Sequence, residues 1–132
     1  MVLDILQTSA IILGLILAVW GLFHQLIVGG ALMVFEDLNE QEARILIMSW
    51  VAQGAFMSFT GVVTALSLFF HGIMNEAVRT VIAITGVALL LMASHVFVSG
   101  YRIALKPVRV GAILELLTGA VLLVLSVWIM VV

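Results

Sequence analysis

Four polar side chains that could do chemistry interrupt the long apolar stretches of this sequence: His24, Gln53, His95 and Glu115. Imidazole nitrogen is a common ligand of haem iron and of transition metals, and a carboxylate extends the ligand set toward non-haem metals. Counted inward along straight helices from their expected membrane boundaries, His24 and His95 each lie about 15–17 Å deep. If their helices stand diagonally in a bundle, the two rings face each other at one level.

Three interpretations of these residues remain open. In the first, His24, His95 and Gln53 hold a cofactor such as haem b, or His24, His95 and Glu115 hold a transition metal. In the second, Glu115 is a station on a proton or ion path that continues along polar residues of the second helix. In the third, all four side chains are interhelical hydrogen-bonding groups, each bond worth about 0.6–2 kcal/mol.

We favour the third interpretation, which makes the protein a non-catalytic structural or accessory component of a larger membrane assembly. A chain with four short spans has little room for a catalytic apparatus. The sequence also contains no Gly-rich phosphate loop, no HExxH motif and no nucleophile elbow. We therefore expect that the protein is not an enzyme.

The composition places the chain in a membrane. Of its 132 residues, 65% are hydrophobic and 9% are charged, whereas soluble domains carry about 25% charged residues. The net charge of −2 provides no basic surface for nucleic acid. The absence of cysteine excludes disulfides, thiolate metal sites and cysteine catalysis. The expected partners are therefore the lipid bilayer and either further copies of the chain or other membrane subunits.

Four stretches are long enough to cross a hydrocarbon core of about 30 Å. They run over about residues 5–35, 43–70, 77–105 and 108–132. Asn39 with Glu42 has the capping-box spacing, Asn75 is a plausible N-cap, and Pro107 suits the first turn of the last helix. Because the links are short, neighbouring helices must be antiparallel. The prediction is an all-α integral membrane protein, a four-helix up-down bundle forming one domain over residues 1–132.

The distribution of basic residues predicts an orientation. Arg44, Arg102, Lys106 and Arg109 fall on the side of the first and third links, and Arg79 falls on the other side. The positive-inside rule then makes both termini external and the two basic loops cytoplasmic. The first stretch has no basic segment before it and is much longer than a signal-peptide core of about 7–15 residues, so we expect a retained helix. The expected location is a bacterial inner membrane.

Polar and small residues recur on one face of each predicted helix. Because ionisable groups facing acyl chains lose their hydration, we expect these faces to point inward. His24 and Gly29 also share their spacing with His95 and Gly100, which suggests two related hairpins. The predicted inward faces are Ala10, Gly14, Leu17, Gly21, His24, Val28 and Ala31; then Trp50, Gln53, Met57, Thr60, Thr64, Ser67 and His71; then Thr85, Ala88, Met92, His95, Ser99 and Arg102; and finally Ala112, Glu115, Gly119, Leu122 and Ser126.

Overall fold

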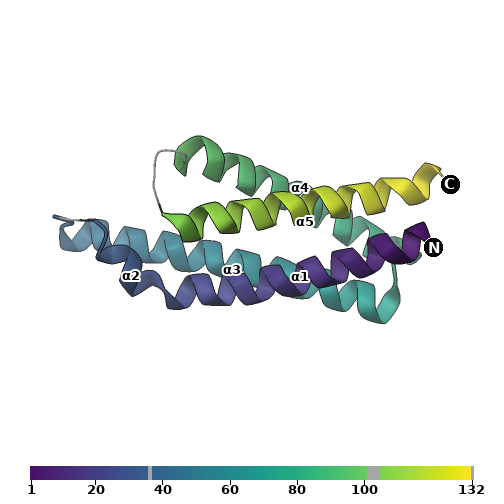
Figure 1. Cartoon of the computed structure of the whole chain (residues 1–132), viewed down its shortest axis with the longest axis horizontal. Helices are drawn as coiled ribbons and strands as arrows, with labels where there is room; N and C mark the ends of the chain where they lie inside the picture. The colour runs from purple at the N-terminus through teal and green to yellow at the C-terminus, as the bar shows by residue number, and fades with distance from the viewer. Residues whose placement is uncertain (36, 101–104, 132) are drawn as a thin grey trace.

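The computed structural model describes residues 1–35, 37–100 and 105–131, and over these residues the regular elements are all helices (Figure 1). Four helices are long and apolar enough to cross a membrane. They pack as antiparallel neighbours, which confirms the predicted up-down bundle. The elements are α1 (Val2–Leu26), α2 (Val28–Leu32), α3 (Glu40–His71), α4 (Glu76–Gly100) and α5 (Lys106–Val131).

The predicted helix starts are confirmed by their hydrogen bonds. Asn39 Oδ1 accepts from the backbone N–H of Glu42 at 3.0 Å, and the Asn39 N–H donates to Glu42 Oε2 at 2.9 Å. These two bonds form the predicted capping box at the start of α3. Asn75 Oδ1 likewise accepts from the Ala77 N–H at 3.0 Å, just before α4.

The first stretch is interrupted earlier than the sequence predicts. Instead of continuing to residue 35, the first helix is interrupted at Ile27, whose φ of −88° and ψ of 6° leave the helical region. Gly29 and Gly30 follow directly, and glycine has a weak helix preference, so little favours continuing the helix through this point. α4 is described as far as Gly100, so the predicted end of the third stretch near residue 105 falls on residues outside the described part of the chain. Arg102 and Val132 lie outside the described residues.

Glycines bring the backbones of two helix pairs into contact. Between α1 and α3, Gly14 lies against Gly61, and a Cβ built on Gly21 would stand 2.5 Å from the Gly54 carbonyl oxygen. Between α4 and α5, a Cβ on Gly86 would stand 3.1 Å from the carbonyl oxygen of Gly119. Small residues permit such close approach of membrane helices. The bundle therefore consists of two tight hairpins, joined mainly where α1 packs on α5.

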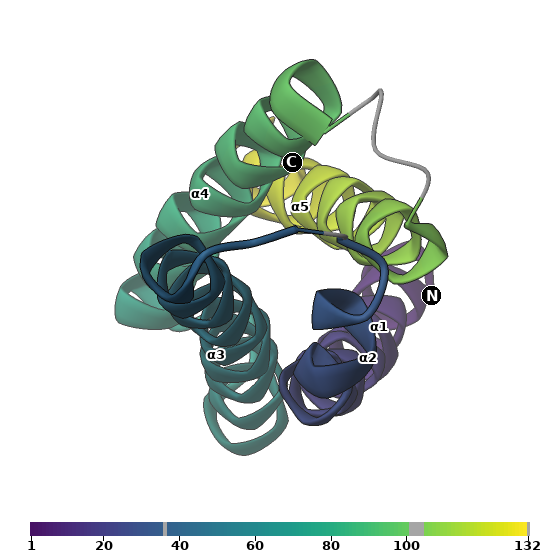
Figure 2. The ribbon, with the colours of Figure 1, turned by 90° about the vertical axis from the view of Figure 1, so that its left-hand side faces the viewer.

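The fourth side of the bundle is loosely packed. We call the end where α3 and α5 begin the loop end, and the opposite end, where α1 begins, the terminal end. α3 and α4 make few contacts with each other. Figure 2, which views the bundle from the loop end, shows α4 leaning away from α3, with α1 and α4 at opposite corners. An opening lined by residues of α3 and α4 lies at the loop end.

Three of the predicted inward faces are confirmed by burial, whereas that of α4 is half-buried at Ala88 and Met92 and is wrong at His95 and Ser99. The faces of α1 and α5 are buried, as is most of that of α3, although His71 at its end is exposed. In α4 the buried residues are Val78, Ile82, Thr85, Gly86, Leu89 and Ala93, whereas His95 and Ser99 are exposed. The contact between Gly86 and Gly119 turns the small residues of α4 toward α5. The predicted face, which contains His95, lies one position earlier along the chain than the face that contains Gly86. One residue corresponds to about 100° around a helix, so His95 is turned away from the interior.

Candidate functional site

His24 is buried at the loop end of α1. Its side chain is fully buried, and neither ring nitrogen has a hydrogen-bond partner among the described residues. The Trp50 ring stacks on the imidazole with ring centroids 4.3 Å apart and an interplanar angle of 4°. The Trp50 indole N–H also donates to the His24 carbonyl oxygen at 2.5 Å. Trp50 therefore both covers His24 and ties α3 to α1.

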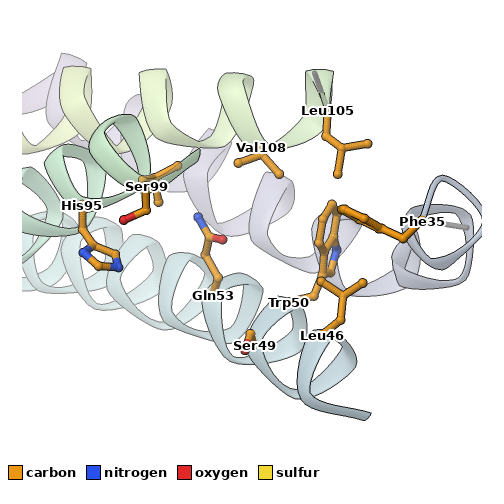
Figure 3. A pocket seen from close by; sticks show the side chains of 10 residues that line it. Phe35, Leu46, Ser49, Trp50, Gln53, His95, Ser99, Leu105 and Val108 are labelled. Atoms are coloured by element: carbon orange, nitrogen blue, oxygen red, sulfur yellow. The ribbon is translucent and has the colours of Figure 1, made fainter. Parts of the chain in front are cut away.

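A cleft between α3 and α4 opens at the loop end on the far side of Trp50. Its volume is about 300 Å³, and its wall is mostly apolar. Figure 3 shows the Gln53 amide between His95 and Trp50, with Ser99 nearby. The amide nitrogen of Gln53 is buried without a partner among the described residues. We call this the α3–α4 cleft; it is lined by Phe35, Leu46, Ser49, Trp50, Gln53, His95, Val96, Ser99, Leu105 and Val108.

Glu115 forms a second buried centre on α5. The residue is fully buried, and neither carboxyl oxygen has a hydrogen-bond partner among the described residues. Gly111 lies one helical turn before it, and a Cβ there would stand 3.3 Å from the indole nitrogen of Trp20. Thr118 lies three residues after it, and its hydroxyl is also buried without a described partner. Polar groups from α1 and α5 thus gather in the centre of the bundle.

The structure does not bring His24, His95 and Glu115 into one ligand set. His24 is enclosed under Trp50, whereas His95 is exposed at the rim of the α3–α4 cleft. Within residues 1–35, 37–100 and 105–131, no group of three or more His, Asp or Glu residues could hold a metal ion. His24 and His95 therefore lie in different surroundings, one stacked under Trp50 and the other at the rim of the cleft.

The glycine contacts explain why the two histidines differ. Gly14 pairs with Gly61 in the first hairpin, and Gly86 pairs with Gly119 in the second. If Gly14 corresponds to Gly86, then His24 corresponds to Val96 and not to His95. The sequence match of His24–Gly29 with His95–Gly100 therefore differs by one residue from the alignment that the glycine contacts give. One residue is about 100° around a helix, which is enough to turn a side chain from the interior to the cleft rim.

Two contributors to these centres were missing from the sequence prediction. The Trp20 indole reaches the centre of the bundle beside Gly111, and Thr118 lies near Glu115. The three-residue spacing of Thr118 from Glu115 is a signal that could have identified it, since such residues share a helix face. The placement of Trp20 depends on how closely α1 approaches α5. A sequence pattern within one helix does not predict the distance between two helices.

The fold and these two centres define a small membrane bundle with polar groups inside it and at one lateral opening. A comparison with protein-family models, with curated proteins and with solved structures found no match.

Proposed function

We propose that this protein is a non-enzymatic component of a membrane assembly that contains at least two copies of the chain, joined through the α3–α4 cleft. One observation carries the proposal. α1–α3, α4–α5 and α1–α5 are packed, whereas α3 and α4 separate toward the loop end and leave polar side chains at the opening. In a membrane interior, the polar side chains at such an opening need a covering partner, because lipid cannot form hydrogen bonds with them.

The cleft is costly to leave against lipid. His95 and Ser99 are exposed on α4, and Gln53 points into the same space from α3. Acyl chains offer no hydrogen bonds, so polar groups in the hydrocarbon turn toward protein or water. Interhelical bonds of this kind contribute about 0.6–2 kcal/mol each. Covering the cleft with another polar surface would therefore stabilise the chain.

The chemistry of the cleft favours a second copy as the covering partner. Among the residues that the structure describes, its lining includes no Lys, Arg, Asp or Glu, so these lining residues bring no like charges together when two copies meet. Glutamine and serine both donate and accept hydrogen bonds, and so does a neutral imidazole. A surface of such groups is complementary to itself. Two-fold symmetry, the commonest arrangement in homo-oligomers, places the same patch on both sides of an interface.

Disulfide cross-linking tests this proposal directly, because the chain has no cysteine of its own. Ser49→Cys and Ser99→Cys place a thiol at the cleft. Leu22→Cys is the matched control, because this residue is 56% exposed on α1, away from the cleft. Under mild oxidation in native membranes, we expect dimers of the chain with both cleft variants and none with Leu22→Cys.

Three outcomes would contradict the proposal. Cross-linking of Leu22→Cys to the same extent would indicate random collision. Adducts larger than a dimer of this chain would indicate a different protein partner. An absence of dimers, together with an amphipathic small molecule that co-purifies with the wild type and is lost on Gln53→Leu, would make the cleft a ligand site.

A further inference from the structure

We propose that Glu115 is a proton-binding site in the interior of the bundle. Its carboxyl group takes up and releases a proton while the side chain stays buried. The inference is independent of the α3–α4 cleft, because Glu115 does not line that cleft. It begins from the full burial of the side chain and from the two carboxyl oxygens that have no described partner.

Among the described residues, no hydrogen bond or ion pair neutralises Glu115. The helices that pack most extensively on α5 are α1 and α4, and Met57 of α3 also reaches Gly111 of α5. The titratable side chains of these helices and of α3 lie near helix ends or are exposed, apart from His24, which is buried under Trp50. They are Asp4 and His24 on α1; Glu76, Arg79 and His95 on α4; and Glu40, Glu42, Arg44 and His71 on α3, while α5 itself adds Lys106 and Arg109 at the loop end.

A buried carboxylate without a counter-charge is expensive, so the site must be neutralised by a proton or by a metal cation. A hard cation requires several oxygen ligands. Over the part of the chain that the structure describes, no further Asp or Glu joins Glu115 in a group of three or more possible ligands. The nearby Trp20 indole is a donor only and cannot ligate a cation. The neighbourhood therefore favours a proton.

Hydroxyl groups give this proton a direction of exchange. From Glu115 toward the terminal end, α5 carries Thr118 and Ser126, both buried, and α3 carries the buried Thr64. A hydroxyl group both donates and accepts hydrogen bonds, so hydroxyl groups and water molecules between them can form a chain along which a proton moves. The route proposed for Glu115 therefore leads to the terminal end rather than to the cleft.

A lipid-soluble carbodiimide tests the site, because this reagent enters the membrane and reacts with protonated carboxyl groups. The wild-type chain in phospholipid vesicles is treated with dicyclohexylcarbodiimide over a series of pH values, and the modified residue is identified by mass spectrometry. We expect an adduct on Glu115 whose yield falls as the pH rises. Sodium or potassium at constant ionic strength should leave the yield unchanged. Glu115→Gln should lose the adduct, while the exposed Glu76 still reacts with a water-soluble carbodiimide.

Each alternative outcome overturns the proposal. No adduct on Glu115 at any pH would mean that the carboxyl is never protonated and reachable. A yield independent of pH would indicate a permanently neutral, structural carboxyl. Protection by sodium would indicate a cation site. If Glu115→Gln fails to fold, the wild-type modification map still decides among these cases, because it assigns the adduct to a residue without any variant.

Discussion

Substituting Gly21 by alanine tests the close contact between α1 and α3. A Cβ at this position would meet the Gly54 carbonyl oxygen at 2.5 Å, the Ser58 backbone nitrogen at 2.6 Å and the Met57 Cβ at 2.7 Å. Ordinary van der Waals contact begins at 3.4 Å, so the helices must separate by up to about 0.9 Å. The obstructing atoms are backbone or Cβ atoms and cannot rotate away. The separation would also lengthen the bond from Ser58 Oγ to the Ala18 carbonyl, now 3.1 Å.

The expected magnitude follows from two opposing effects. Overpacking of a close-packed interior costs about 1–3 kcal/mol. Alanine returns up to about 1 kcal/mol through its better helix preference. Because the clash at Gly21 is with rigid atoms, the overpacking cost should lie near its upper value of about 3 kcal/mol. After the gain of about 1 kcal/mol in helix preference, we expect Gly21→Ala to lower the free energy of unfolding by about 2 kcal/mol.

The assay is unfolding in mixed micelles with increasing sodium dodecyl sulfate, followed by circular dichroism. Gly29→Ala is the matched control, because a Cβ there meets nothing within 4 Å. We expect that variant to be as stable as the wild type or slightly more stable. Gly86→Ala should fall between the two, since its nearest atoms lie at 3.1–3.2 Å and include flexible leucine side chains. Equal stability of Gly21→Ala and Gly29→Ala would refute the contact between α1 and α3.

Two further predictions concern single hydrogen-bonding side chains. Gln7 joins α1 to the α3–α4 turn, because its amide donates to the Leu68 carbonyl at 3.4 Å and accepts from the Ile73 N–H at 3.2 Å. Gln7→Met should therefore speed hydrogen exchange at the Ile73 amide, and unchanged exchange there would contradict the link. Trp50→Phe keeps an aromatic ring over His24 but removes the donor to its carbonyl, so it should cost about 0.5–1.5 kcal/mol. Trp50→Ala should cost more in the same micelle assay, and equal losses would show that the stacked ring contributes nothing.

The sequence alone determined the four membrane helices, their antiparallel order and their capping residues. It also determined the inward faces of α1 and α5 and most of that of α3. These features depend on local properties: apolar length, capping chemistry and a repeating small or polar face. His24 and Glu115 are buried as predicted because small residues share their face and bring it against a neighbouring helix.

Only the tertiary structure decided how α4 is rotated, and therefore where His95 lies. In α4 the polar residues and the small residues fall on different faces, and the sequence contains no rule for choosing between them. The contact of Gly86 with Gly119 makes the choice, because two backbones can approach closely only where both helices lack side chains. The stacking of Trp50 on His24, the position of Trp20 beside Gly111 and the separation of α3 from α4 likewise depend on distances between helices, which no single helix encodes.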